Sequence, residues 1–131
     1  MNITKIAPAH VDERGSISDI LYKEPIEHVT IIHSKKGAKR GNHFHKESTQ
    51  WIYVLNGVME YWHSDVNRKN IQMVLMNEGD LVHTPPSEIH ALYMVTPVSF
   101  LAISHGLRGG EDYESDTYRV DNIIGSSEHH E

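Results

Sequence analysis

Cysteine is absent from this chain of 131 residues. Its absence excludes disulfides and thiolate zinc sites, so any metal would need histidine, glutamine or carboxylate ligands. Long apolar runs are absent as well. The longest, such as WIYVL at 51–55 and MVLM at 73–76, fall far below the roughly 20 residues of a membrane-spanning helix. The opening MNITKIAPAH contains no apolar signal core, so we expect a cytoplasmic protein with no membrane partner.

An excess of positive charge is also lacking, because the formal net charge is −6. This balance argues against a nucleic-acid partner, which requires a basic surface. Five cations nonetheless lie between residues 35 and 46, whereas acids gather in EDYESD (111–116) and SSEHHE (126–131). A locally basic and globally acidic chain favours a small anionic ligand; the alternative is a solvated charged loop.

The chain contains eight short runs in which Val, Ile, Tyr and Trp are frequent, separated by turn residues. The runs are SISDILY (16–22), HVTIIH (28–33), QWIYVL (50–55), VMEYWH (58–63), IQMVLM (71–76), DLVHT (80–84), HALYMV (90–95) and VSFLAIS (98–104). This spacing predicts an all-β sandwich or barrel. We expect one domain over residues 1–124, followed by a polar, disordered tail at 125–131. Asn56-Gly57 predicts a β-hairpin with a type I′ turn between two of the strands.

Alternation along the predicted strands places several polar groups together. His43 and His45 share one face. If the Ile52/Val54 and Leu92/Met94 faces point inward, then Gln50 and His90 lie at the mouth of the barrel. A mouth with four convergent polar groups above an apolar interior is a common site for small ligands.

Two stretches of the sequence resemble the motifs of the cupin superfamily. The first motif consists of Gly, five residues, His-x-His, an acidic position and a later Gly. Its positions are matched here by Gly37, His43, His45, Gln50 in place of Glu, and Gly57. The second is matched by Gly79, Pro85, Ser87 in a glycine position, His90 and Met94 in an asparagine position. The resemblance implies a double-stranded β-helix, or cupin jelly roll.

A narrower resemblance concerns DERGSI, RGNHFHK, PPSEIH and EDYESDTY, which look like stretches of the dTDP-sugar 3,4-ketoisomerases and of related 3,5-epimerases of polysaccharide pathways. In the ketoisomerases the RG-x-H-x-H-K stretch carries the catalytic histidines and no metal is required, which implies this role for His43 and His45. The resemblance also implies that Arg14, Arg40 and Lys46 lie near a nucleotide sugar, and that the protein is a homodimer. Thr30, Ile31 and Ile32 stand where the ketoisomerases have tyrosines, so isomerase and epimerase both remain open.

Histidine chemistry fits either reaction, because the imidazole pKa lies near neutrality and the ring can take up and return a proton. In this interpretation His43 and His45 move protons and no cofactor is needed. His90 and Gln50 would hydrogen-bond the developing enediolate oxygen, and Arg40, Lys46 and Arg14 would hold a diphosphate. His83 either lines the mouth or simply ends a strand.

Two alternatives use the same residues. His43, His45, Gln50 and His90 can instead bind a divalent Zn, Fe, Ni or Mn ion, as in a metal-dependent oxygenase, lyase or phosphosugar isomerase. The protein can also be a sugar-binding cupin without catalytic activity, because a fold does not determine a function.

Overall fold

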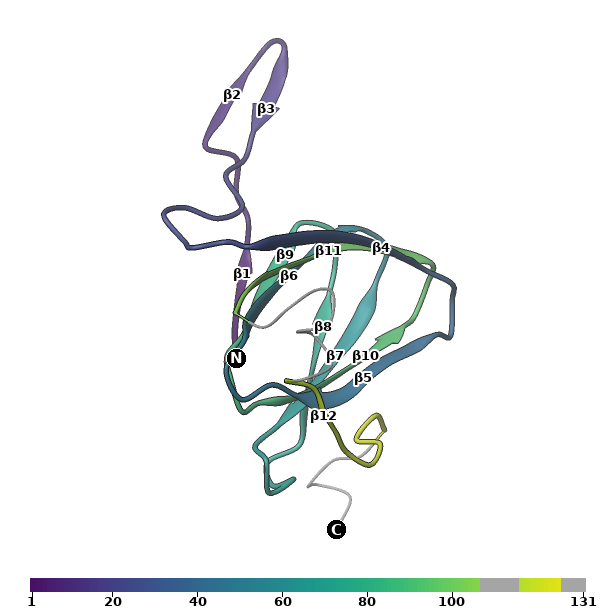
Figure 1. The fold of residues 1–131 in the computed structure, drawn as a ribbon. Coiled ribbons are helices and arrows are strands. Elements are labelled where there is room, and N and C mark those ends of the chain that lie inside the picture. The colour runs from purple at the N-terminus through teal and green to yellow at the C-terminus, as the bar shows by residue number, and fades with distance from the viewer. Residues whose placement is uncertain (107–115, 126–131) are drawn as a thin grey trace.

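The computed structural model describes residues 1–106 and 116–125 (Figure 1). This part of the chain contains twelve strands. In chain order they are β1 (Asn2–Lys5), β2 (His10–Asp12), β3 (Gly15–Ile17), β4 (His28–Ser34), β5 (Lys39–Phe44), β6 (Thr49–Asn56), β7 (Met59–Ser64), β8 (Gln72–Met76), β9 (Asp80–Thr84), β10 (Ile89–Met94), β11 (Val98–His105) and β12 (Tyr118–Arg119). Within these described ranges, no helix has the length and apolarity needed to cross a membrane.

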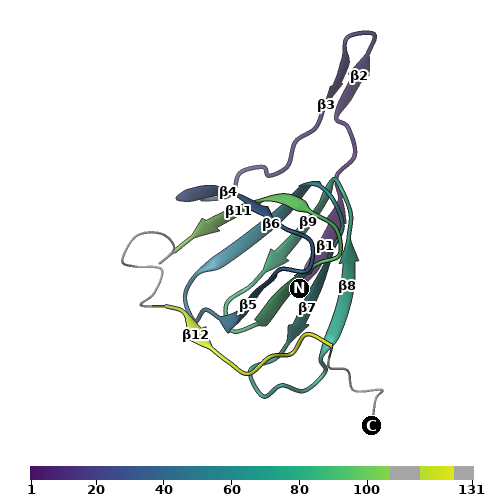
Figure 2. The ribbon, with the colours of Figure 1, turned by 90° about the vertical axis from the view of Figure 1, so that its right-hand side faces the viewer.

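Ten of the strands form two antiparallel sheets that face one another (Figures 1 and 2). The first sheet has the order β1-β9-β6-β11-β4, and the second has the order β12-β5-β10-β7-β8. From β4 to β7 each successive strand changes sheet, and β9, β10, β11 and β12 do the same. This path is that of a double-stranded β-helix in a single domain, so the predicted fold class is confirmed.

The main core fills the space between the two sheets. As alternation predicted, Ile52 and Val54 point inward from β6 and meet Leu92 and Met94 from β10, and each of the four is at most 5% exposed. A second apolar cluster lies on the outer face of the first sheet, where Trp51, Leu81 and Ile103 are covered by residues that include Ile20 and Leu21.

The prediction of a β-hairpin at Asn56-Gly57 is wrong. β6 belongs to the first sheet and β7 to the second, so this pair turns a corner between the sheets. Only Gly57 has a positive φ, of 93°, whereas a type I′ turn needs two such residues. A Cβ at Gly57 would collide with the backbone oxygen of Pro97, so glycine is required here by close packing.

The N-terminal region also differs from its prediction. The expected strand at 16–22 is limited to β3, which pairs with β2 in a hairpin that projects away from the barrel (Figures 1 and 2). Residues 18–22 are not in a strand, because Ile20 and Leu21 instead cover the outer face of the first sheet. Most of the predicted tail at 125–131 lies outside the described residues.

Candidate active site

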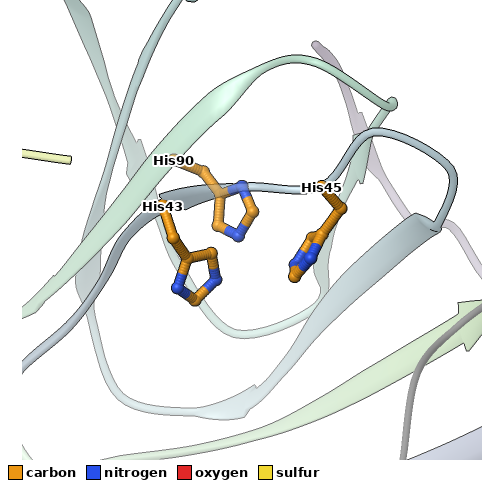
Figure 3. Close-up of side chains that lie close together, drawn as sticks. All are labelled: His43, His45 and His90. Atoms are coloured by element: carbon orange, nitrogen blue, oxygen red, sulfur yellow. The ribbon is translucent and has the colours of Figure 1, made fainter. Parts of the chain in front are cut away.

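Three histidines converge at one end of the barrel (Figure 3). His43 lies near the end of β5, His45 follows that strand directly, and His90 lies on β10 beside them. The ring centroids are 4.6 Å apart for His43 and His90, 4.9 Å for His43 and His45, and 5.5 Å for His45 and His90. His45 and His90 are buried, whereas His43 is partly exposed. The predicted histidine cluster therefore forms.

A β-bulge brings His43 opposite His90. His90 pairs with His43, but the next residue, Ala91, pairs with Gly41, so Asn42 is extra in β5. Gly41 and Asn42 both have positive φ, of 91° and 56°. A Cβ on Gly41 would lie only 2.7 Å from the backbone oxygen of His90. The bulge therefore re-aims the end of β5, as bulges beside active sites do.

Backbone carbonyl groups orient two of the three rings. His45 Nδ1 lies 2.9 Å from the carbonyl oxygen of Asp116, and His90 Nδ1 lies 3.2 Å from that of Glu88. A carbonyl oxygen can only accept a hydrogen bond, so Nδ1 is the donor in each ring. In the neutral form Nε2 then carries the lone pair that can accept a proton or bind a metal.

Asp116 also organises the loop that follows His45. Its carboxylate accepts hydrogen bonds from the backbone amides of Lys46, Glu47 and Ser48 at 2.9–3.1 Å. Burial by itself raises the pKa of Asp116, but these amide hydrogen bonds outweigh burial and hold the pKa below its usual value. Asp116 is therefore a positioning residue for His45 that the sequence-based site did not contain, although its stretch EDYESDTY was noted.

The turn of the second motif is hydrogen-bonded to the backbone of the first motif. Ser87, which stands in the glycine position, has a φ of 66° and so keeps the left-handed backbone of that position. Its amide donates a hydrogen bond of 2.6 Å to the carbonyl oxygen of His45. The loop before β10 thus fixes the backbone of the loop after β5.

A cavity of about 340 Å³ opens beside the histidines. His43, His90 and Gln50 line its polar end, while Ile52 and Leu92 lie deeper. Gln50 is buried on β6 of the first sheet, between its paired residues Thr84 on β9 and Ser104 on β11. Five lining residues of the cavity thus match the expected barrel mouth and its apolar interior. His45 is not among the lining residues; it is buried, with its ring centroid 4.9 Å from that of His43.

Cations occupy one edge of this cavity. Lys39 and Arg40 come from β5, and Arg119 comes from β12. Arg40 is held by a 2.7 Å hydrogen bond from its Nε to the hydroxyl of Ser34. Sequence analysis predicted Arg40 but missed Lys39 and Arg119. The run KKGAKR was a signal for Lys39, whereas Arg119 is distant in sequence and is brought in only by the pairing of β12 with β5.

The other three predicted substrate-binding residues do not line the cavity. Lys46 lies over the ring of Tyr118, with its Nζ 4.5 Å from the ring centroid. His83 is on the outer face of the first sheet, where it hydrogen-bonds Thr49 and packs against Trp51. Arg14 is on the projecting hairpin, where its Nη2 lies 2.7 Å from a carboxylate oxygen of Asp12.

A further histidine, His63, lies directly across from His90 on β7. Its Nδ1 is 3.8 Å from the carboxylate of Glu88, and burial lowers the pKa of His63. Burial also raises the pKa of Glu88, and the Tyr61 hydroxyl is 3.4 Å from this carboxylate. Alternation in VMEYWH places Tyr61 and His63 on one face, but the sequence analysis did not predict His63 as a site residue.

The histidines also fit a metal ion. One ring nitrogen from each of His43, His45 and His90 lies within 4.8 Å of the others, and three imidazoles suit a first-row divalent ion. The carbonyl partners of His45 and His90 are of the kind that orients ligating histidines in metal sites. Gln50 would add a neutral amide oxygen in place of a carboxylate.

Residues 30–104 match the family model described as a cupin domain, which is more than half of the chain. The chain belongs to the cupin family. No curated protein sequence matches this cupin significantly.

Several solved structures share the cupin's fold at low identity. A sugar 3,4-ketoisomerase from Thermoanaerobacterium thermosaccharolyticum, QdtA, in complex with TDP is 18% identical, with a TM-score of 0.75 over 98% of this chain and 95% of its own. A 3,4-ketoisomerase from Helicobacter canadensis is 18% identical, with a TM-score of 0.76 over 91% and 90%. A dTDP-4-dehydrorhamnose 3,5-epimerase from Sulfolobus tokodaii is 17% identical, with a TM-score of 0.72 over 88% and 73%.

Proposed function

We propose that this cupin is an isomerase or epimerase that acts on a nucleotide-linked keto-deoxy sugar in polysaccharide biosynthesis, using its own histidines as acid and base. One observation carries the proposal: His43 and His90 line the same cavity as three cations. Such a cavity suits a neutral sugar ring attached to phosphate. The similarity in fold to ketoisomerases and an epimerase supports this substrate class.

The proposed chemistry begins with loss of a proton from the carbon next to the sugar carbonyl. His43 takes this proton, the C–H electron pair becomes the C=C bond of an enediolate, and the carbonyl electrons move to oxygen. Gln50 and His90 stabilise that oxygen by hydrogen bonding. Return of a proton to the former carbonyl carbon, with transfer of the hydroxyl proton of the first carbon to the former carbonyl oxygen, moves the ketone, whereas return of the proton to the opposite face of the first carbon inverts that carbon. Neither route needs an oxidant or a cofactor.

His45 has a supporting role in this scheme. It is buried against His43 with its Nδ1–H on the Asp116 carbonyl, so its Nε2 is the nitrogen that can share a proton. The two ring centroids are only 4.9 Å apart, so a positive charge on one ring disfavours a positive charge on the other. His43 contacts the substrate and His45 controls how readily His43 gives up its proton.

Asparagine substitutions test the assignment. His43→Asn and His45→Asn should each reduce turnover of TDP-4-keto-6-deoxyglucose, followed by NMR, by about 10²–10⁴-fold, as loss of an acid–base group does. His33→Asn is a matched control, because His33 is an exposed histidine on β4 that is hydrogen-bonded to Ser99. Full activity in both site variants would disprove the role. Tight binding of the sugar nucleotide without any turnover would indicate the non-catalytic alternative.

A metal-dependent reaction is the second candidate, favoured by the three ring nitrogens within 4.8 Å. A bound divalent ion would supply Lewis-acid polarisation of a substrate oxygen. His43, His45, His90 and Gln50 would hold it. Elemental analysis of untagged protein, compared with His90→Asn, tests this candidate. Near-stoichiometric Zn, Fe, Ni or Mn that is lost in the variant supports it, and equal trace amounts in both oppose it.

We further propose that the protein is a homodimer. Val11 and Ile17 on the projecting hairpin are 67% and 60% exposed, and Val29 and Ile31 on β4 are 62% and 53% exposed. An isolated two-stranded hairpin is marginally stable in water, so contact with a second copy would stabilise it. In this arrangement the hairpin that carries Arg14 contacts the other subunit, because it points away from its own barrel (Figure 2).

A further inference from the structure

The turn between β9 and β10, residues 85–88, ends at the carbonyl group that orients the His90 ring. Its two prolines have a fixed φ, and Ser87 has a positive φ of 66°, a conformation that costs energy for any residue with a side chain. Such a turn keeps its shape only where the surrounding structure holds it. One contact that does so is the hydrogen bond from the Ser87 amide to the His45 carbonyl oxygen.

Tyr61 on β7 reaches both ends of this turn. Its hydroxyl lies 2.5 Å from the hydroxyl of Thr84, directly before the turn, and 3.4 Å from a carboxylate oxygen of Glu88, at the end of the turn. An ionised carboxylate can only accept a hydrogen bond, so the Tyr61 O–H is directed to Glu88 and the Thr84 O–H to Tyr61. Tyr61 is fully buried and Thr84 is 1% exposed. Bulk water therefore cannot replace either partner.

The hydrogen bond between Tyr61 and Thr84 also joins the two sheets near the histidines. Tyr61 belongs to the second sheet, where it pairs with Leu92, two residues from His90. Thr84 belongs to the first sheet, where it pairs with Gln50. The bond thus spans the interior of the barrel between the neighbours of the two strands that carry His90 and Gln50. It helps to fix the spacing of these two residues, which line the same cavity.

We propose that the side chains of Tyr61, Thr84 and Glu88, here called the turn clamp, position His90 for the reaction. The clamp touches no reacting atom. It holds the turn so that the Glu88 carbonyl oxygen stays beside His90 Nδ1, and this contact fixes the orientation and the tautomer of the ring. The inference rests on the proposed function and adds to it the residues that hold His90 in place.

The Tyr61 hydroxyl is suited to this role because it keeps its proton. Burial, together with the nearby charge of Glu88, raises the pKa of Tyr61 well above its usual value. The hydroxyl is therefore a donor throughout the pH range in which the histidines titrate.

Two substitutions test the turn clamp. Tyr61→Phe removes only the hydroxyl, and Thr84→Val replaces the other hydroxyl with a methyl group of similar size. Each should lower kcat for TDP-4-keto-6-deoxyglucose by about 10–100-fold, the cost of a small displacement of a catalytic group, and leave KM nearly unchanged. Thr84→Ser keeps a hydroxyl and should retain most of the activity. Tyr53→Phe is the matched control, because Tyr53 is a partly buried tyrosine in the apolar cluster outside the first sheet.

The His90 ring gives a second readout that does not require turnover. Two-bond ¹H–¹⁵N NMR spectra at about pH 8.5, above the ordinary histidine pKa, should show wild-type His90 with its proton on Nδ1. Tyr61→Phe and Thr84→Val should shift the ring signals toward a mixture of tautomers, whereas Thr84→Ser and Tyr53→Phe should leave them in place. The signals are assigned by their loss in His90→Asn.

The outcomes separate the turn clamp from the reaction. Unchanged His90 signals in folded Tyr61→Phe and Thr84→Val disprove the clamp, whatever happens to activity, and so do shifted signals with an unchanged kcat in an active enzyme. If the signals shift as expected but wild type converts no keto sugar nucleotide, the clamp stands and the isomerase or epimerase proposal fails. Thermal melting checks folding; if Tyr61→Phe does not fold, the comparison of Thr84→Val with Thr84→Ser decides.

Discussion

Gly41 and Asn42 form the bulge that aims His43 at His90. We expect Gly41→Ala to destabilise the protein by about 2 kcal/mol or more, because the new Cβ meets the His90 carbonyl at 2.7 Å and φ is positive. Activity should fall with it, since the two histidines lose their register. Urea denaturation and turnover measure the two effects.

Gly79→Ala is the control for this prediction. Gly79 has a similar φ of 86°, but nothing lies within 4 Å of a Cβ placed there. Its substitution should cost only the backbone strain, about 1 kcal/mol, and leave turnover unchanged. Equal losses of stability and activity in both variants would contradict the role of close packing at Gly41.

Asp116 gives a pH-dependent prediction. Its pKa is lower in the folded protein than the usual 3.8, so its contribution to stability is present above that value and is lost as pH falls through the folded pKa. Asp116→Asn should lower the free energy of unfolding by about 1–3 kcal/mol near pH 6. The difference from wild type should shrink near pH 3, as measured by urea denaturation.

Asp121→Asn serves as the comparison, because Asp121 is an exposed carboxylate close to Asp116 in the sequence. It should change stability little at either pH. A constant difference between Asp116→Asn and wild type at both pH values would show that the Asp116 charge does not stabilise the loop after His45.

Individual site residues differ in how readily the sequence revealed them. His43, His45 and His90 could be grouped because they occupy fixed positions in two motifs and alternate on strands. Asp116 and Arg119 could not, because each acts across about 70 residues of chain on a loop or strand whose neighbour is set only by tertiary pairing. His63 was accessible through alternation, but a single histidine in a strand carries no sign of its partner.

At the scale of elements, periodicity predicted the strands with long apolar faces. It missed β1, β2 and β12, which are at most four residues long and mostly exposed. It also missed β5, whose sequence KRGNHF has no apolar alternation although it carries His43. It also misassigned Asn56-Gly57, because a strand–turn–strand pattern does not specify whether the two strands share a sheet.

The β2–β3 hairpin gives a prediction about the oligomeric state. Wild-type protein should run as a dimer of twice its 15.0 kDa chain mass in size-exclusion chromatography with light scattering. The double variant Val11→Lys/Ile17→Lys should shift the mass toward the monomer, because both side chains are exposed on the hairpin. Val66→Lys, at an exposed apolar residue in a different loop, should remain dimeric. A monomeric wild type would refute the dimer.

At the scale of the whole molecule, the two sheets enclose an apolar core, and the cavity beside the cluster combines His43 and His90 with three cations. The core explains stability, and under the proposed function the cavity would select a polar ring that carries negative charge. The cupin fold itself hosts varied chemistry, so the assignment depends on what this cavity does to a proton beside a carbonyl.

Proton abstraction can be measured without knowing which product forms. TDP-4-keto-6-deoxyglucose should be incubated in D₂O with wild-type protein and with His43→Asn, and followed by NMR. Our account predicts that wild type incorporates deuterium at the carbonyl carbon or at a carbon next to it. His43→Asn should reduce the rate of incorporation by at least about 10²-fold. No incorporation by wild type, or equal rates in the two proteins, would contradict acid–base catalysis by His43 on this substrate.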